Sequence, residues 1–136
     1  MITREADYAI RTIACLAGHG VETQQPVSMA DVSKQMNIPY RFLRKLARRL
    51  VQAGLVQSRR GKHGGLILTR SPASITLLDA IQGMAPDAAQ LSPCLTNPKQ
   101  CRRSGYCRVH AELRRIQQQT DLQLDQVTFD HLTDPE

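Results

Sequence analysis

Tryptophan is absent from this chain of 136 residues, which also has only three Tyr and two Phe. Long apolar runs are missing too: the longest cover four or five residues, far fewer than the ~20 of a membrane-spanning helix. Near the start, Glu5 and Asp7 stand where a secretion signal needs a basic and then an apolar segment. These absences predict a soluble, cytoplasmic protein without a membrane partner.

Acidic residues are missing between Asp31 and Asp79, although the chain has twelve Asp and Glu in total. Because ordinary protein surfaces mix both signs of charge, a segment with basic charge alone favours a polyanion partner over a merely solvated face. The basic residues of this segment are Lys34, Arg41, Arg44, Lys45, Arg48, Arg49, Arg59, Arg60, Lys62 and Arg70.

The length and a hydrophobic content of 41% predict one globular domain with a small appendage. Segments with helical spacing are 3–18, 29–35, 39–52, 75–84 and 106–122. Segments with strand character are 55–60 and 66–69, on either side of a glycine-rich turn. Two short helices followed by a hairpin form a winged helix-turn-helix. The predicted fold class is therefore mainly α with a small β-hairpin, completed by a long C-terminal helix.

Short polar side chains precede three of the helical segments. We predict Thr3, Ser28 and Ser74 as their caps, because such side chains accept hydrogen bonds from the first free backbone N–H groups. Pro39 is predicted at the first position of the next helix. Cys15 is predicted to be a small core residue. The inward residues expected on segment 39–52 are Phe42, Leu43, Leu46, Leu50 and Val51.

The second helix of the pair has the charge expected of a DNA-recognition helix. In a helix-turn-helix, the N-terminal half of this helix meets base edges in the major groove. Arg41, Arg44 and Lys45 lie in that half, and Arg can bind guanine through two hydrogen bonds. Arg48 and Arg49 lie further along and are expected at phosphate, while Tyr40 can stack on bases or touch the backbone.

The predicted hairpin tip is cationic and rich in small residues. Arg60, Lys62 and His63 lie there, and such a tip can approach the minor groove, whose negative potential attracts Arg. A basic helix and a basic hairpin in this order are more specific than any single Arg. The predicted partner is double-stranded DNA; the alternative of an RNA-binding module fits a wing less well.

Three cysteines and a histidine form a second group, Cys94-x6-Cys101-x5-Cys107-x2-His110, in a region with three prolines. Structural zinc sites usually use short C-x2-C spacings. The wider gaps here favour an iron–sulfur cluster, which distributes its ligands over several irons. Zinc binding and thiol oxidation stay open as alternatives. An enzyme with Cys107 as nucleophile and His110 as base is a remote one, because no third group is evident to orient the base.

The ordered set of segments resembles the IscR/NsrR-type winged-helix regulators that carry iron–sulfur clusters. The segments that carry the resemblance are 3–11, 54–65, 74–81, the three-cysteine loop and 127–132. Together they cover nearly the whole length. The chain is thereby divided into a winged-helix DNA-binding domain (1–84), a cysteine-rich cluster-binding loop (85–107) and a dimerisation helix with its tail (106–136).

The resemblance implies a transcriptional regulator, most simply a repressor, that binds a palindromic operator as a homodimer. The positions that match DNA contacts of the recognition helix are Pro39, Tyr40, Arg41, Arg44 and Lys45. Arg60 matches the wing residue that enters the minor groove, and Ser28 is a further candidate contact.

The resemblance also implies a 2Fe–2S or 4Fe–4S cluster held by Cys94, Cys101 and Cys107. His110 matches the fourth ligand of the IscR-like 2Fe–2S members, and Asp7 matches the NsrR-like 4Fe–4S members, where it comes from the partner subunit. The first cysteine gap is one residue longer than in those groups, so both cluster types stay open. We favour His110, because imidazole ligates iron readily. The implied signal is redox state, nitric oxide or iron.

Overall fold

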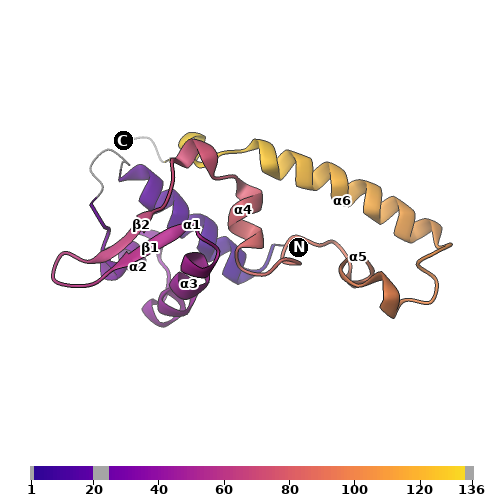
Figure 1. Ribbon diagram of the computed structural model, residues 1–136, viewed down its shortest axis with the longest axis horizontal. Coiled ribbons are helices and arrows are strands. Elements are labelled where there is room, and N and C mark those ends of the chain that lie inside the picture. Colours follow the sequence, from indigo (N-terminus) through magenta and orange to yellow (C-terminus); the bar gives the residue numbers. More distant parts are fainter. Residues whose placement is uncertain (1, 20–24, 134–136) are drawn as a thin grey trace.

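The computed structural model describes residues 2–19 and 25–133 (Figure 1). The helices are α1 (Arg4–Gly18), α2 (Met29–Met36), α3 (Tyr40–Gln52), α4 (Leu77–Gln82), α5 (Pro93–Thr96) and α6 (Arg108–Gln126), with 3₁₀ turns at Pro72–Ser74, Pro98–Gln100 and Phe129–His131. The strands β1 (Val56–Arg59) and β2 (Gly65–Leu68) form an antiparallel hairpin. The expected class, mainly α with a small hairpin, is confirmed. None of the helices in the described ranges combines the length and apolar character of a bilayer crossing.

Local capping explains where the first helices begin and end. Thr3 and Ser28 are the predicted caps: their hydroxyl oxygens accept the N–H groups of Ala6 and Asp31, each at 3.1 Å. Asn37 then adopts a left-handed conformation (φ 52°) that ends α2, which suits its short polar side chain. Pro39 precedes α3 as its cap residue and is not the first helical residue.

One apolar core joins α1 to α2, α3, α4 and β2. Its largest fully buried side chains include Ile13, Leu43, Leu50 and Phe129. Cys15 is 2% exposed and belongs to this core, as predicted. Phe129 lies beyond α6, so the end of the described chain returns to complete the core.

The predicted inward positions of Phe42 and Val51 are wrong, because these side chains are 52% and 41% exposed. The buried residues of α3 are Leu43, Leu46, Ala47 and Leu50. Their spacing of three, one and three defines a narrow stripe, and at 100° per residue Phe42 falls beside it. Its ring instead contacts Tyr8 of α1, with ring centroids 6.3 Å apart.

The helix expected over 75–84 with Ser74 as its cap is also wrong in its start. Helix α4 begins after Thr76, which forms a capping box with Asp79, and Ser71 caps the preceding 3₁₀ turn. Ile75 is extended because its carbonyl accepts the N–H of Phe129 at 3.1 Å. Pairing with the C-terminal segment therefore prevents an earlier helix start.

The segment after α4 contains more local structure than a plain loop, with α5 and a 3₁₀ turn before α6. Helix α6 covers Arg108–Gln126, shifted from the expected 106–122, and Cys107 is its cap residue. Figure 1 shows α6 extending away from the winged domain (α1–α4 and the hairpin), with the linker after α4 running below it to α5. The cysteine loop lies at the far end of this extension.

The hairpin is held against the segment before α2 by an isolated antiparallel bridge between Val27 and Leu66. Val27 and Leu66 exchange backbone hydrogen bonds of 2.9 and 2.8 Å. Gly65 has φ 153°, and a Cβ at this position would lie 2.1 Å from the Val27 carbonyl oxygen. Glycine is therefore required where the two backbones meet.

We expect Gly65→Ala to lower the free energy of unfolding by about 1–3 kcal/mol, because it adds an atom against backbone at a positive φ. Chemical denaturation monitored by circular dichroism measures the change. Gly18→Ala is the matched control, since a Cβ there meets nothing within 4 Å. Equal stability of the two variants would contradict the close approach.

Candidate nucleic-acid interface and cysteine loop

The exposed face of α3 carries the cations predicted for it. Arg41, Arg44, Lys45 and Arg48 line a shallow groove of about 410 Å³ together with Tyr40. No ion pair in the described part of the chain involves any of the four. Positive charge without nearby counter-charge is what a polyanion-binding face requires.

A second groove connects this face to the hairpin. It has a volume of about 620 Å³, and Met29, Arg44, Arg48 and Ser58 are among the residues that line it. It therefore lies between the start of α2, the exposed side of α3 and strand β1. Ser28 precedes Met29 and is half-buried, with its hydroxyl engaged as the α2 cap.

The hairpin tip presents the other predicted cations to solvent. Arg60, Lys62 and His63 are exposed between β1 and β2, and Figure 1 shows the tip projecting from the winged domain. The turn is closed by the Gly64 N–H, which donates to the Gly61 carbonyl at 3.0 Å. Helix α3 and the hairpin tip thus present two separate cationic surfaces.

Arg49 belongs to the same basic helix but serves another purpose. Its guanidinium donates to the Glu5 carboxylate at 2.5 Å, which joins α3 to α1. Arg70, at the end of the hairpin, likewise pairs with Asp79 of α4 at 3.1 Å. Both ion pairs are partly exposed and link neighbouring elements while adding little to stability, a pairing that sequence spacing alone did not show.

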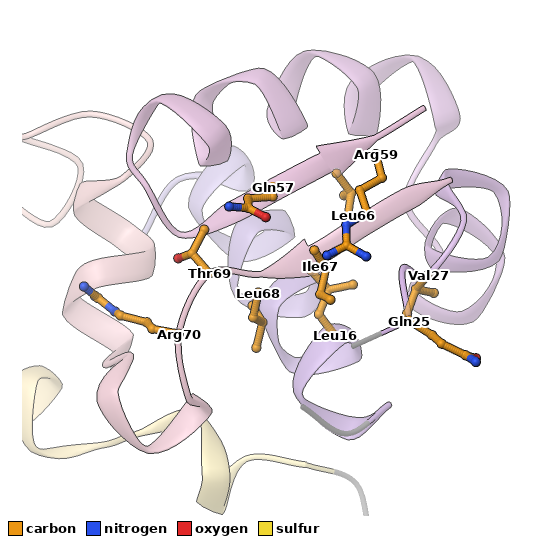
Figure 2. Close-up of a pocket in the computed structure, with 10 residues that line it drawn as sticks. All are labelled: Leu16, Gln25, Val27, Gln57, Arg59, Leu66, Ile67, Leu68, Thr69 and Arg70. Atoms are coloured by element: carbon orange, nitrogen blue, oxygen red, sulfur yellow. The ribbon is translucent and has the colours of Figure 1, made fainter. Parts of the chain in front are cut away.

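A cavity of about 200 Å³ lies at the base of the hairpin (Figure 2). Leu16, Val27 and Leu66 contribute apolar lining, while Gln57 and Arg59 are polar residues of its wall. None of the predicted site residues lines it. No local sequence pattern predicts this cavity, because its walls come from α1, the hairpin and the segment before α2.

The three loop cysteines are half-buried thiols outside any disulfide. Cys94 lies in α5, Cys101 follows the 3₁₀ turn, and Cys107 caps α6. The Cys94 Sγ lies 3.4 Å from the His110 Nδ1. Two of the four predicted loop donors are therefore in contact.

The position of Cys107 favours its thiolate. A hydrogen bond from the backbone N–H of His110 lowers the pKa of Cys107, with smaller help from the Val109 N–H and the Arg103 charge, against some desolvation. This is the effect expected at a helix N-terminus. Burial acts oppositely on Cys15, whose pKa it raises to about 11; its Sγ donates to the Gln35 side chain at 3.5 Å.

The structure does not gather the four predicted donors into one site: within the described ranges only Cys94 and His110 of this set are in contact. In the described ranges, no three His, Cys, Asp or Glu side chains gather as a mononuclear site requires. Three free thiols with an imidazole nevertheless match cluster chemistry, in which the ligands are distributed over several irons. Asp7, the other predicted fourth ligand, pairs with Arg11 of its own helix at 2.7 Å.

Comparisons with known proteins agree with this combination of parts. The Rrf2 family, described as "Iron-dependent Transcriptional regulator", matches residues 2–135. The transcriptional repressor NsrR of Streptomyces coelicolor is 28% identical over 131 residues, which is 96% of this chain and 86% of that protein. Protein rrf2 of Nitratidesulfovibrio vulgaris is 32% identical over 106 residues, 78% of this chain and 69% of that protein.

Solved structures support the fold. T. potens IscR superposes with a TM-score of 0.74 at 25% identity, covering 97% of this chain and 85% of that one. CymR, the global cysteine regulator of B. subtilis, has a TM-score of 0.75 at 24% identity, with 98% of each chain covered. The relatives are named as regulators and not as enzymes, in agreement with expectation. The chain therefore belongs to the Rrf2 family of transcriptional regulators and is a DNA-binding protein with a winged helix-turn-helix.

Proposed function

We propose that this protein is a homodimeric repressor whose operator binding is controlled by an iron–sulfur cluster in the cysteine loop. One observation carries the proposal: Cys94 contacts His110 on α6, the same helix that joins the winged domain at its other end. Helix α6 thus contacts the cysteine loop at one end and the winged domain at the other. Because its operator lies in the chromosome, the protein would act in the cytoplasm.

On DNA, α3 would occupy the major groove. Arg41, Arg44 and Lys45, in its N-terminal half, would meet base edges. Arg60 would enter the minor groove. The residues assigned to the phosphate backbone are Ser28, Pro39, Tyr40, Arg48, Lys62 and His63.

The residues that would hold the cluster are Cys94, Cys101, Cys107 and His110. The contact between Cys94 and His110 supports the imidazole as fourth ligand, while the pairing of Asp7 with Arg11 engages the competing carboxylate. A bound cluster supplies sensitivity to oxidants, to nitric oxide and to iron supply. Exposed Arg102, Arg103 and other neighbouring cations would offset the charge of its thiolates.

Apolar side chains on α6 support the dimer. Val109 and Ile116 are 66% and 40% exposed and lie on one face, seven residues apart. Exposed apolar residues at heptad spacing are stabilised by a second helix of the same kind. A two-fold dimer would place two copies of α3 on the half-sites of a palindromic operator.

The far end of α6 supplies a route from the loop to DNA. There the Leu77 N–H donates to the Val127 carbonyl at 2.9 Å, and the Thr76 hydroxyl donates to Asp125 at 3.3 Å. A change in the loop that shifts α6 would therefore also shift the winged domain. In a dimer this changes the distance between the two recognition helices.

A second candidate, sensing by thiol oxidation, rests on Cys107. Its pKa is lowered by the hydrogen bond from the His110 N–H, and a stabilised thiolate reacts faster with oxidants. Zinc binding would be a third use of the same donors. Analysis of metal and sulfide separates the three.

We expect protein purified without oxygen to be coloured and to contain iron and sulfide in about equal amounts. Cys94→Ala should abolish the colour, and His110→Ala should change the visible spectrum while Asp7→Ala leaves it unaltered. Colourless, iron-free protein that binds its operator fully would refute cluster control. Stoichiometric zinc, or reversible disulfide formation without iron, would support the alternatives.

Arg44→Ala should weaken operator binding about 10- to 100-fold, because a base-reading Arg contributes about 1–3 kcal/mol. The operator is first selected from a randomised palindromic duplex pool, and affinity is measured by fluorescence anisotropy at fixed salt. Arg49→Ala is the control, since this Arg pairs with Glu5 and should change affinity less than threefold. Similar losses in both variants would contradict the assignment of α3 residues.

Ile116→Asp should convert the dimer to monomers, because it places a charge in the apolar face of α6. Analytical ultracentrifugation measures the change. Gln118→Asp, also exposed on α6 but about 200° around the helix from Ile116, should leave the mass unchanged. A wild-type protein that sediments as a monomer at micromolar concentration would refute the proposed dimer.

A further inference from the structure

Gln117 is the buried side chain of α6, with 5% of its surface exposed. Its Oε1 accepts the backbone N–H of Leu91 at 2.7 Å, and its Nε2 donates to the Ala89 carbonyl at 3.1 Å. A third hydrogen bond, from Nε2 to the Asp121 carboxylate at 2.7 Å, fixes the orientation of the amide, so that Oε1 faces Leu91 and Nε2 faces Ala89. One side chain thus bonds the chain between α4 and α5, at Ala89 and Leu91, to the middle of α6, acting both as donor and as acceptor.

The cysteine loop has little else to hold its position. From residue 90 to residue 108 no side chain is buried, so apolar packing contributes little to the placement of this segment. The described contacts of the loop with α6 include the packing of α5 and the Cys94–His110 contact. The hydrogen bonds of Gln117 to Ala89 and Leu91, here called the clamp, therefore fix the loop on α6 just before its first cysteine.

The spacing of the two contacts is matched. His110 and Gln117 are seven residues apart, so they lie on nearly the same face of α6 and about 10 Å apart along its axis. Leu91 and Cys94 are three residues apart, and three residues extend at most about 10 Å. Ser92 between them is extended (φ −151°, ψ 145°). Only Ser92 and the first residue of α5 separate Leu91 from Cys94, so holding Leu91 at Gln117 limits where Cys94 can lie along α6.

We propose that Gln117 is a positioning residue that sets the register of the cysteine loop on α6 and so places Cys94 against His110. The Gln117 amide supplies both the acceptor for Leu91 and the donor for Ala89 from one side chain. The register itself does not depend on a cofactor. The consequence, that Gln117 presents His110 as the fourth cluster ligand, rests on the proposed function.

The first test measures thiol exposure in reduced, metal-free, full-length protein. Alkylation of each cysteine by N-ethylmaleimide is followed by mass spectrometry. Gln117→Leu should raise the rate at Cys94 about tenfold relative to Cys107, and Gln119→Leu, on the opposite face of α6, should not. An unchanged Cys94 rate in a variant with wild-type helix content would overturn the proposal.

Two further variants separate positioning from general destabilisation. Gln117→Glu keeps the acceptor for Leu91 but loses both donors, so the Cys94 rate should rise about three- to tenfold. Adding Asp121→Asn exchanges the amide and the carboxylate, so their hydrogen bond is kept in the reverse direction. This pair restores the bond between positions 117 and 121 but not the donor to the Ala89 carbonyl, so the rate should fall part of the way from the Gln117→Glu value towards wild type. Failure of the pair to lower the rate would count against the clamp.

The second test uses protein purified without oxygen and reads the ligand set. The electron paramagnetic resonance spectrum of the reduced Gln117→Leu variant should differ from wild type, whereas that of Gln119→Leu should not. An unchanged spectrum would overturn the ligand-presenting role, whatever the alkylation rates. If the wild type itself carries no cluster, the proposed function fails, while the alkylation rates still decide whether Gln117 sets the loop register.

Discussion

The backbone pairing between the start of α4 and the segment that follows α6 is the constraint on which this architecture depends. The N–H groups of Leu77 and Phe129 donate to the carbonyls of Val127 and Ile75, and the Phe129 ring is fully buried. This pairing joins the C-terminal end of α6 to the winged domain, while its N-terminal end extends outward with the cysteine loop. A helix anchored at one end transmits any displacement of its other end, because its backbone hydrogen bonds make it stiff.

Two of the basic residues between Asp31 and Asp79 form ion pairs with other elements of the fold, whereas within the described ranges the cations on the exposed face of α3 do not. Arg49 and Arg70 pair with Glu5 and Asp79, acids that lie outside the acid-free segment. The first pair joins α3 to α1, and the second joins the hairpin to α4. The surface that remains cationic is therefore the one that combines the recognition helix with the wing, as binding to a duplex requires.

Periodicity predicted most of the elements because their stabilising contacts are local or follow one helical face. The caps at Thr3 and Ser28, the left-handed residue Asn37 and the hairpin follow from side-chain chemistry over a few residues. The errors occurred where distant segments meet. Phe42 was predicted inward, yet it lies beside the buried stripe and contacts Tyr8. Helix α4 begins later than predicted, because Ile75 is held extended by Phe129.

The sequence by itself determined the winged helix-turn-helix, the cationic character of α3 and the hairpin tip, and the presence of a cysteine-rich segment, since each follows from residue type and short spacing. The family resemblance added the expectation of a cluster and a dimer, which stay proposals. Only the tertiary structure showed which cations are paired, that Cys94 meets His110, and that Gln117 bonds the linker to α6. Those contacts join residues 16 to 44 positions apart in the chain. Such pairings depend on how whole elements pack, and local patterns do not encode that packing.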